Sequence, residues 1–178
     1  MSDTDDEFEA FSAAPETEDS PLGVMTRLID TEGMFSFLKT GEARIAVFMR
    51  HFPKEKQGRI VLGELALPRF QGGLARLGSW LLQRATWFQG PDYILMIDQD
   101  WWDGARPEAQ EALVFHELMH AEHAVDRDGE LKFDDEGRPV WSLKGHDIEE
   151  FREVARRYGD WSGEIGTFVD AARIGGVT

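Results

Sequence analysis

A chain of 178 residues, 42% of them hydrophobic and with twelve phenylalanines and six tryptophans, is long enough for one domain with its own core. The absence of cysteine excludes disulfide bonds, a thiol nucleophile and a zinc ribbon held by four cysteines. The formal net charge of −15 argues against binding to nucleic acids or anionic membranes, because proteins that bind polyanions usually carry a basic face.

Acidic residues are concentrated at the N-terminus. Residues 1–20 carry eight acidic side chains and no basic one, and a segment of this composition cannot bury enough apolar area to offset its chain entropy. We therefore predict a disordered acidic tail over residues 1–20 and a single domain over residues 21–178. The tail has neither the basic start nor the apolar stretch of a secretory signal, and no run of about 18 apolar residues follows it. The expected location is the cytoplasm.

The chain between the tail and residue 106 alternates between helical and strand patterns. We expect two short helices, two strands joined by a polar turn, a helix with regularly spaced leucines and a buried strand, over residues 22–30, 32–39, 43–50, 59–67, 73–85 and 93–97. The last run is apolar throughout, as is typical of a central strand covered on both faces. Trp101 and Trp102 follow it and are expected to pack in the core. The order of elements predicts an α+β fold with a small mixed sheet packed with helices.

The next segment carries the pattern that bears most on function. Pro107 fits a first helical turn, and residues 109–125 contain no glycine or proline, so a helix is expected here. It contains the sequence HELMH, from His116 to His120, which reads H-E-x-x-H. Residues four apart share a helix face, so the two imidazoles can hold one Zn²⁺ ion at about 2.0–2.1 Å. Glu117 would lie close enough to act as a base toward a water on that ion.

The motif supplies two protein ligands, and a catalytic zinc site needs a third and an open fourth position. His123 shares the predicted helix face but would lie about 10 Å along the axis from His116, too far for one ion to be reached by all three histidines. We therefore interpret His123 as a surface or supporting residue. His51 follows a strand-like run and precedes Pro53, so it is expected in an exposed loop.

His146 is the preferred third ligand. It directly precedes an expected helix that starts at Asp147, and this is a rigid place from which to reach the metal. A hairpin over residues 131–142 would reverse the chain and bring it back toward the first two histidines. Carboxylates also serve as third ligands in such sites, so Glu150 and Glu149 remain alternatives.

With these motifs, the chain resembles the phage metallopeptidase family. The resemblance rests on HELMHAEH, on the later segment GHDIEEFREVARRYGDW and on the upstream strands, and it covers roughly residues 22–172. It implies a zincin-like hydrolase carried by phages and prophages, with His116, His120 and His146 on zinc and Glu117 as the base. A phage-encoded protein could also belong to the virion. A looser similarity to SprT-type proteases exists, but this chain lacks their zinc ribbon and basic arm.

The predicted activity is hydrolysis of a peptide bond with one zinc ion and Glu117 as general base. The expected partner is a peptide or protein substrate, held as an extended strand along a sheet edge, and neither nucleic acid nor membrane is expected. Tyr93 and Tyr158 are candidates to stabilise the oxyanion, although Tyr158 suits core packing better. Two alternatives remain open: a zinc-binding interaction module of a phage particle without proteolytic activity, and a metallohydrolase that acts on a non-peptide amide.

Overall fold

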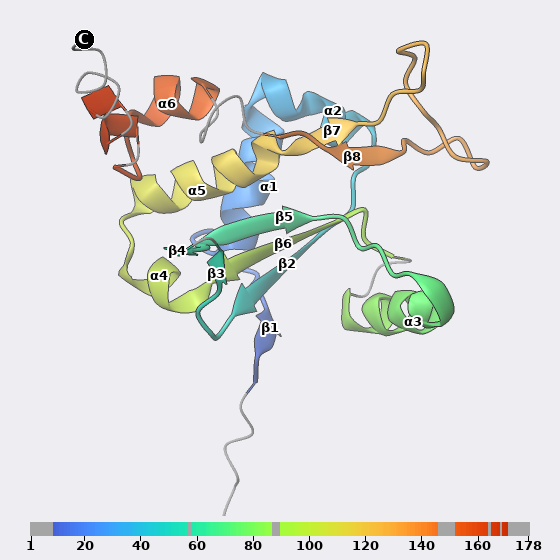
Figure 1. Cartoon of the computed structure of the whole chain (residues 1–178), viewed down its shortest axis with the longest axis horizontal. Coiled ribbons are helices and arrows are strands. Elements are labelled where there is room, and N and C mark those ends of the chain that lie inside the picture. The colour runs from blue at the N-terminus through green and yellow to red at the C-terminus, as the bar shows by residue number, and fades with distance from the viewer. Residues whose placement is uncertain are drawn as a thin grey trace, which may run out of the picture.

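The computed structural model describes residues 9–56, 58–86, 90–145, 152–163, 165–167 and 169–170. A four-stranded sheet lies beside helices α1 and α5 (Figure 1). The main helices are α1 (Pro21–Thr31), α2 (Ser36–Thr40), α3 (Ala75–Thr86), α4 (Gln99–Gly104), α5 (Pro107–Met119) and α6 (Arg152–Tyr158), with short 3-10 turns η1 (Gly33–Phe35) and η2 (Gly72–Leu74). The strands are β1 (Phe11–Ala13), β2 (Ile45–Arg50), β3 (Glu55–Lys56), β4 (Arg59–Ile60), β5 (Gly63–Ala66), β6 (Tyr93–Asp98), β7 (Ala121–His123) and β8 (Trp141–Leu143).

The sheet is mixed, with strand order β1-β2-β6-β5. Strands β2 and β6 are parallel, whereas β1 and β5 run antiparallel on the two edges. The predicted α+β class is confirmed, and β6 is the central strand that its apolar run indicated. The predicted strand over residues 59–67 is divided into β4 and β5, and β6 separates β5 from β2.

Alternate residues of the two central strands form the core beneath α1 and α5. Successive strand residues point to opposite faces, and the set that shares one face is buried: Ile45, Val47, Met49, Tyr93, Leu95 and Ile97. They belong to the same cluster as Leu28 of α1 and Phe115 and Leu118 of α5. Each such side chain contributes about 1.5–3 kcal/mol on burial. The core therefore fixes α5, which carries the H-E-x-x-H motif, against the sheet.

The ordered chain begins earlier than the sequence predicted. Residues 1–8 lie outside the described residues, but β1 pairs with β2, and Ala14 is only 7% exposed in the core. Phe11 packs edge-on against Phe52, with ring centroids 5.3 Å apart. The side chain of Ser20 caps α1 by accepting from the Gly23 N–H. The predicted tail boundary at residue 20 is thus wrong for residues 9–20, because strand pairing and these contacts outweigh the acidic composition.

Helix α5 is shorter than predicted. It starts at Pro107 as expected, but it ends at Met119, and residues 121–123 form β7 instead of two further helical turns. Pairing of β7 with β8 overrides the helix propensity of this segment, which contains no glycine or proline to mark the change. His123 therefore does not lie on the helix face of His116. Its Nε2 donates to the Lys132 carbonyl over 2.7 Å, so His123 stabilises the hairpin that follows β7.

The predicted reversal of the chain before residue 143 is confirmed. Bridges join Val125 to Leu131 and Phe133 to Pro139, and the strands β7 and β8 lie side by side at the base (Figure 1). The Asp134 side chain accepts two backbone N–H groups in the tip of the hairpin. The consequence is that Lys144 lies next to His120, with its backbone N–H donating to the His120 carbonyl over 2.7 Å.

Helix α3 is present as predicted, but its leucines are not packed in the core. Leu74, just before the helix, and Leu77 and Leu81 within it are 67%, 49% and 52% exposed. The helix lies to one side of the sheet, at the right of Figure 1. Neither it nor any other helix among the described residues is long and apolar enough to cross a membrane.

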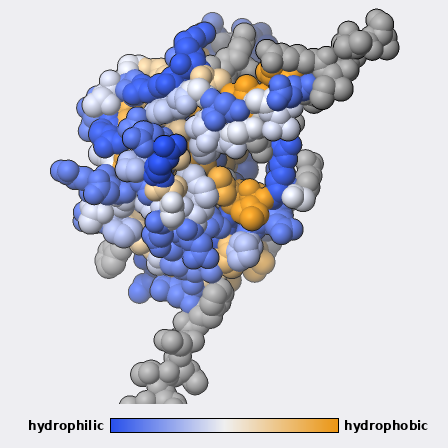
Figure 2. Space-filling view, turned by 90° about the vertical axis from the view of Figure 1, so that its left-hand side faces the viewer, coloured by the Kyte–Doolittle hydropathy of each residue, from blue (hydrophilic) through white to orange (hydrophobic). Residues whose placement is uncertain are grey.

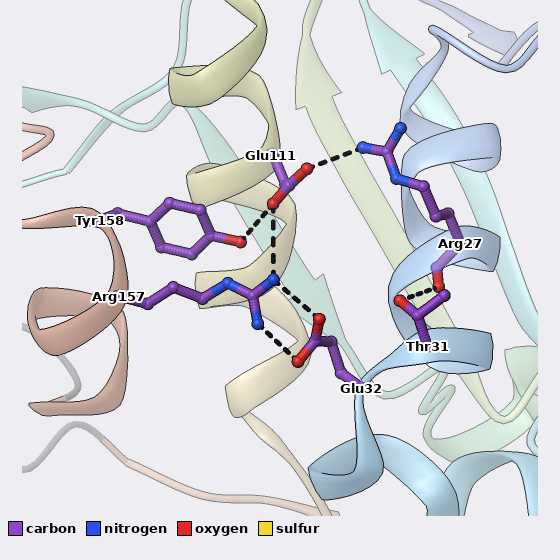
Figure 3. A network of polar contacts seen from close by, with 6 residues as sticks. All are labelled: Arg27, Thr31, Glu32, Glu111, Arg157 and Tyr158. Carbon is purple, nitrogen blue, oxygen red and sulfur yellow. Dashed lines mark hydrogen bonds and ion pairs between the residues drawn. The ribbon is translucent and has the colours of Figure 1, made fainter.

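A polar network fastens α6 to α1 and α5 (Figure 3). Glu111 of α5 accepts from Tyr158 of α6 and from Arg27 of α1, each over 2.8 Å. Arg157 donates to Glu32 over 2.7 Å. Burial, and then the bond to Glu111, raise the pKa of Tyr158, so its hydroxyl remains a donor. The network holds α6 beside the helix that carries the motif.

We expect Glu32→Gln to lower the free energy of unfolding by at most about 1 kcal/mol near neutral pH, because the Arg157 pair is partly exposed. The hydrogen bond from Arg157 lowers the pKa of Glu32 below its ordinary value of 4.5. This stabilisation is present above that value and is lost as pH falls through the lowered pKa. Urea unfolding at about pH 7 and about pH 3 checks this, since the difference between wild type and variant should be smaller at the lower pH. A difference that is as large or larger in acid would contradict it.

Candidate functional site

Helix α5 presents His116 and His120 on one face. Although α5 ends at Met119, His120 keeps a helical backbone with φ −73° and ψ −20°, so the four-residue spacing holds. The two imidazole centroids are 5.3 Å apart, with ring planes at 70°. Both side chains are partly buried and line the same cleft. The structure therefore brings together the two histidines that the motif predicted.

The orientation of His120 is set by the backbone at Lys144. Its Nδ1 lies 2.8 Å from the Lys144 carbonyl, which can only accept, so Nδ1 carries the proton. In this tautomer Nε2 presents a lone pair, which is the form that binds metal ions. The carbonyl of Lys144 thus fixes the orientation of the His120 ring and keeps its proton on Nδ1, as backbone carbonyls do for histidine ligands in metal sites.

Glu117 lies buried between α5 and the edge strand β5, and its side chain is only 5% exposed. Its Oε2 accepts the backbone N–H of Leu65 over 2.8 Å. The backbone N–H of Asp98 donates to the carbonyl of Leu62, so the backbone groups of Leu62 face β6. Successive residues of an edge strand direct their N–H and C=O groups to opposite sides, so those of Gly63 and Leu65 lie on the outer side of β5. The carboxylate is therefore anchored to the outer edge of the sheet, beside the two histidines.

Gly63 leaves the space that Glu117 occupies. A Cβ added at Gly63 would lie 3.1 Å from both Cγ and Oε1 of Glu117 and 3.1 Å from Leu113. Contacts this short require a neighbour to move by a few tenths of an ångström. The residue at position 63 thus determines where the carboxylate of Glu117 lies.

We expect Gly63→Ala to lower kcat on a cleaved peptide by roughly tenfold, since small displacements of a reacting group are costly. Zinc content should be unchanged, because neither histidine is displaced. The matched control is Gly104→Ala, where an added Cβ meets nothing within 4 Å. Steady-state kinetics and metal analysis on the two variants check this, and equal kcat values would show that Gly63 does not position Glu117.

The motif opens into a cleft of about 570 Å³ between α5, the β3–β5 segment and the chain after β8. Its lining combines apolar and cationic side chains around the motif, including Ile60, Leu113, Leu143 and Trp161 and also Lys54, Lys56, Arg59 and Lys144. Figure 2 shows the side of the molecule that lies at the left of Figure 1, where hydrophilic residues surround a smaller apolar group. A cleft of this kind can hold a chain segment that has both apolar and charged side chains.

Trp161 supports the histidine side of the cleft. Its ring lies edge-on to His116 with centroids 6.4 Å apart, and edge-on to Trp101 with centroids 6.5 Å apart. Trp102 is buried as predicted, whereas Trp101 is only partly buried against the core. Gly159 ends α6 with φ +69°, which turns the chain so that Trp161 reaches His116.

Three other candidates lie away from the cleft. His51 follows β2, and its Nε2 is 2.8 Å from the Ser12 hydroxyl. Tyr93 is fully buried, its hydroxyl donates to the Ser142 carbonyl over 2.8 Å, and burial raises its pKa. Tyr158 donates to Glu111. Neither tyrosine lines the cleft, so the structure gives no support to either as an oxyanion donor.

The preferred third ligand cannot be placed. His146 lies outside the described residues, as do Glu149, Glu150 and the predicted helix start at Asp147. Within the part of the chain that the structure describes, no group of three potential metal ligands comes together. The described range 90–145 ends at Gly145, which itself lines the cleft beside Lys144. The two histidines and the tautomer of His120 fit a zinc ion, and no third ligand joins them among the described residues.

Sequence reasoning missed the residues that surround the motif. Gly63 acts by leaving space for Glu117, and Leu65 acts through its backbone N–H. Nothing in the sequence GELA distinguishes this strand from any other short strand. The carbonyl of Lys144 is equally invisible in sequence. The cations Lys54, Lys56 and Arg59 did carry a signal, because they are clustered in an otherwise acidic chain.

Comparison with known protein families gives a match over most of the chain. The sequence profile of the family described as putative phage metallopeptidase matches residues 11–173. This confirms the resemblance that the motif segments indicated, whereas similarity to SprT-type proteases is not shown. No curated protein and no solved structure matches the chain.

Proposed function

Because the chain belongs to the putative phage metallopeptidase family, we propose that it is a zinc-dependent peptidase with a zincin-like fold. In this proposal His116, His120 and His146 bind one zinc ion, and Glu117 is the general base. The observation that carries it is the convergence of His116, His120 and a buried Glu117 in one cleft beneath the edge strand β5. Glu149 and Glu150 are the alternative third ligands.

The chemistry divides between the ion and the chain. When bound, zinc would polarise the substrate carbonyl and make a water acidic enough to lose a proton near neutral pH. Glu117 would take a proton from the attacking water and return it to the leaving amine. The Leu65 N–H holds the carboxylate in place while it does so. The Lys144 carbonyl keeps the proton of His120 on Nδ1.

The edge strand β5 supports a peptide as the substrate. The Leu65 N–H is taken by Glu117, but the outer side of β5 also directs the backbone groups of Gly63 and the carbonyl of Leu65 toward the cleft, and an extended peptide can add to such an edge through main-chain hydrogen bonds. A peptide bound there would lie across Glu117. The proposed setting is the cytoplasm of a host cell, or a virion, with neither nucleic acid nor membrane as partner.

Metal analysis tests the proposal most directly. We expect wild-type protein, purified without added metal, to contain one zinc ion per chain and to cleave members of a peptide pool. His120→Ala and His146→Ala should each lose zinc, whereas His51→Ala, remote from the cleft, should keep it. Zinc kept in His146→Ala would move the third ligand to Glu150 or Glu149. Zinc without cleavage of any peptide would support a zinc-binding interaction module instead.

A further inference from the structure

Two exposed apolar side chains line the cleft that holds the motif. Ile60 of β4 is 59% exposed and Leu143 of β8 is 41% exposed. Single exposed apolar side chains are common on protein surfaces and need no explanation there. These two differ because they share a concave cleft with His116, Glu117 and His120, where a bound ligand would cover them.

The two apolar side chains lie at opposite ends of the edge strand β5. Strand β4, which carries Ile60, comes just before the start of β5. Because β5 is antiparallel to β6, the start of β6 lies beside the end of β5. There the hydroxyl of Tyr93 donates over 2.8 Å to the carbonyl of Ser142, the residue before Leu143. Figure 1 shows the same order, with β4 at the start of β5 and β8 toward its far end.

Glu117 lies between these two ends. Its carboxylate accepts the Leu65 N–H, and a Cβ added at Gly63 would lie 3.1 Å from its Oε1. The four residues of β5 span about 13 Å, which is also the length of about four residues of an extended peptide beside it. A peptide along this edge would therefore pass Ile60, then Glu117, then Leu143, and the two apolar side chains would contact it on opposite sides of the bond to be cleaved.

We propose that the substrates of this site are peptide segments with bulky apolar side chains on both sides of the scissile bond, and that Ile60 and Leu143 determine this specificity. The inference rests on the peptidase proposed above and specifies its substrate class. Side chains of this kind are mostly buried in folded proteins. The segments that fit are therefore those that unfolded or incompletely folded chains expose.

Cleavage of a peptide pool tests the substrate class. The full zinc-loaded chain is given a pool of short peptides with Leu, Ala, Asp or Lys at every position, and mass spectrometry identifies the residues on each side of every cleaved bond. We expect Leu to exceed Ala by about tenfold on both sides, since apolar pockets discriminate by this order for small differences in side-chain size. Asp and Lys should not exceed Ala. The preference should not shrink as salt rises from about 0.05 M to about 0.5 M, because apolar contacts are not screened.

Two single variants assign the preference to its residues. Threonine keeps strand propensity but places a hydroxyl in the cleft, so Ile60→Thr and Leu143→Thr should each reduce the Leu-to-Ala ratio to less than about threefold on one side of the scissile bond. The two variants should affect different sides. The ratio within one variant does not depend on how much of the protein is folded. The matched control is Leu131→Thr, at a position that is 54% exposed and does not line the cleft, and it should keep both preferences.

Binding separates the substrate class from the reaction. Fluorescein-labelled peptides of one length, with Leu, Ala, Asp or Lys on both sides of the centre, are titrated into zinc-loaded Glu117→Gln. We expect the Leu peptide to bind about tenfold more tightly than the Ala peptide. The same preference without cleavage of any peptide by wild type would support the apolar site and overturn the peptidase.

The remaining outcomes contradict the proposal at defined points. Cleavage without a preference for Leu, or with a preference for Asp or Lys, would overturn the apolar substrate class and leave the peptidase standing. Leu enrichment on one side alone would overturn the two-sided site. Loss of preference in Leu131→Thr, or loss on both sides in each cleft variant, would overturn the roles of Ile60 and Leu143. Neither binding nor cleavage of any peptide would overturn the substrate class together with the peptidase.

Discussion

Glu117→Gln is expected to lower kcat on a cleaved peptide by about 10²- to 10⁴-fold, the usual contribution of a general base. Glutamine is close in size to glutamate, and its side-chain oxygen can still accept the Leu65 N–H that bonds Oε2 in the structure. The variant should therefore keep its fold and its position under β5, but it cannot take a proton. Peptide cleavage followed by mass spectrometry measures the loss.

The zinc content of Glu117→Gln separates the role of the base from that of the ligands. It should equal that of wild type, because His116 and His120 are unchanged and His120 is still oriented by Lys144. Glu108→Gln, at an exposed position in the first turn of the same helix, is the matched control and should keep full activity. Full turnover in Glu117→Gln would remove Glu117 from the mechanism.

The local sequence predicted the parts of the site that depend on helix geometry. His116, Glu117 and His120 lie where a four-residue spacing puts them, since a helix fixes the relative positions of nearby residues. The central strand was equally predictable from its apolar run, although only one of its faces is fully buried: Tyr93, Leu95 and Ile97 are buried, whereas Ile94 and Met96 are half-buried.

Contacts between distant segments were not predictable. The bond from Leu65 to Glu117 spans 52 residues, and the bond from His120 to Lys144 spans 24. Both depend on backbone groups, which every residue has, so side-chain identity gives no signal. The same holds for the end of α5, where pairing with β8 rather than a helix-breaking residue terminates the helix.

The prediction of a disordered tail over residues 1–20 was wrong for residues 9–20 for a related reason. Composition averaged over residues 1–20 hid a short strand whose partner, β2, lies some 40 residues later. Three residues that pair with a buried strand are ordered by that strand, whatever charges precede them. The distribution of charge was more informative at the cleft. In an otherwise acidic chain, the closely spaced basic residues Lys54, Lys56 and Arg59 are unusual, and all three line the cleft.

Arg50→Met is expected to lower the free energy of unfolding by about 3–5 kcal/mol, the usual effect of breaking a buried ion pair. Arg50 is 2% exposed, and its Nη2 lies 3.2 Å from Oδ2 of Asp98, which is 7% exposed. Methionine keeps the apolar stem but leaves the carboxylate of Asp98 buried without its cation. Urea unfolding measures the change, and a loss below about 1 kcal/mol would contradict the buried pair.

A double-mutant cycle with Asp98→Asn isolates that pair. Asparagine can still cap α4 by accepting the Trp101 N–H, so the double variant should be less destabilised than the sum of the two single ones. It should not return to wild type, because Arg50 also donates to the carbonyls of Phe52 and Val61, at the two ends of the hairpin segment that carries Lys56 and Arg59. Hydrogen exchange should therefore be faster in that hairpin in both Arg50→Met proteins.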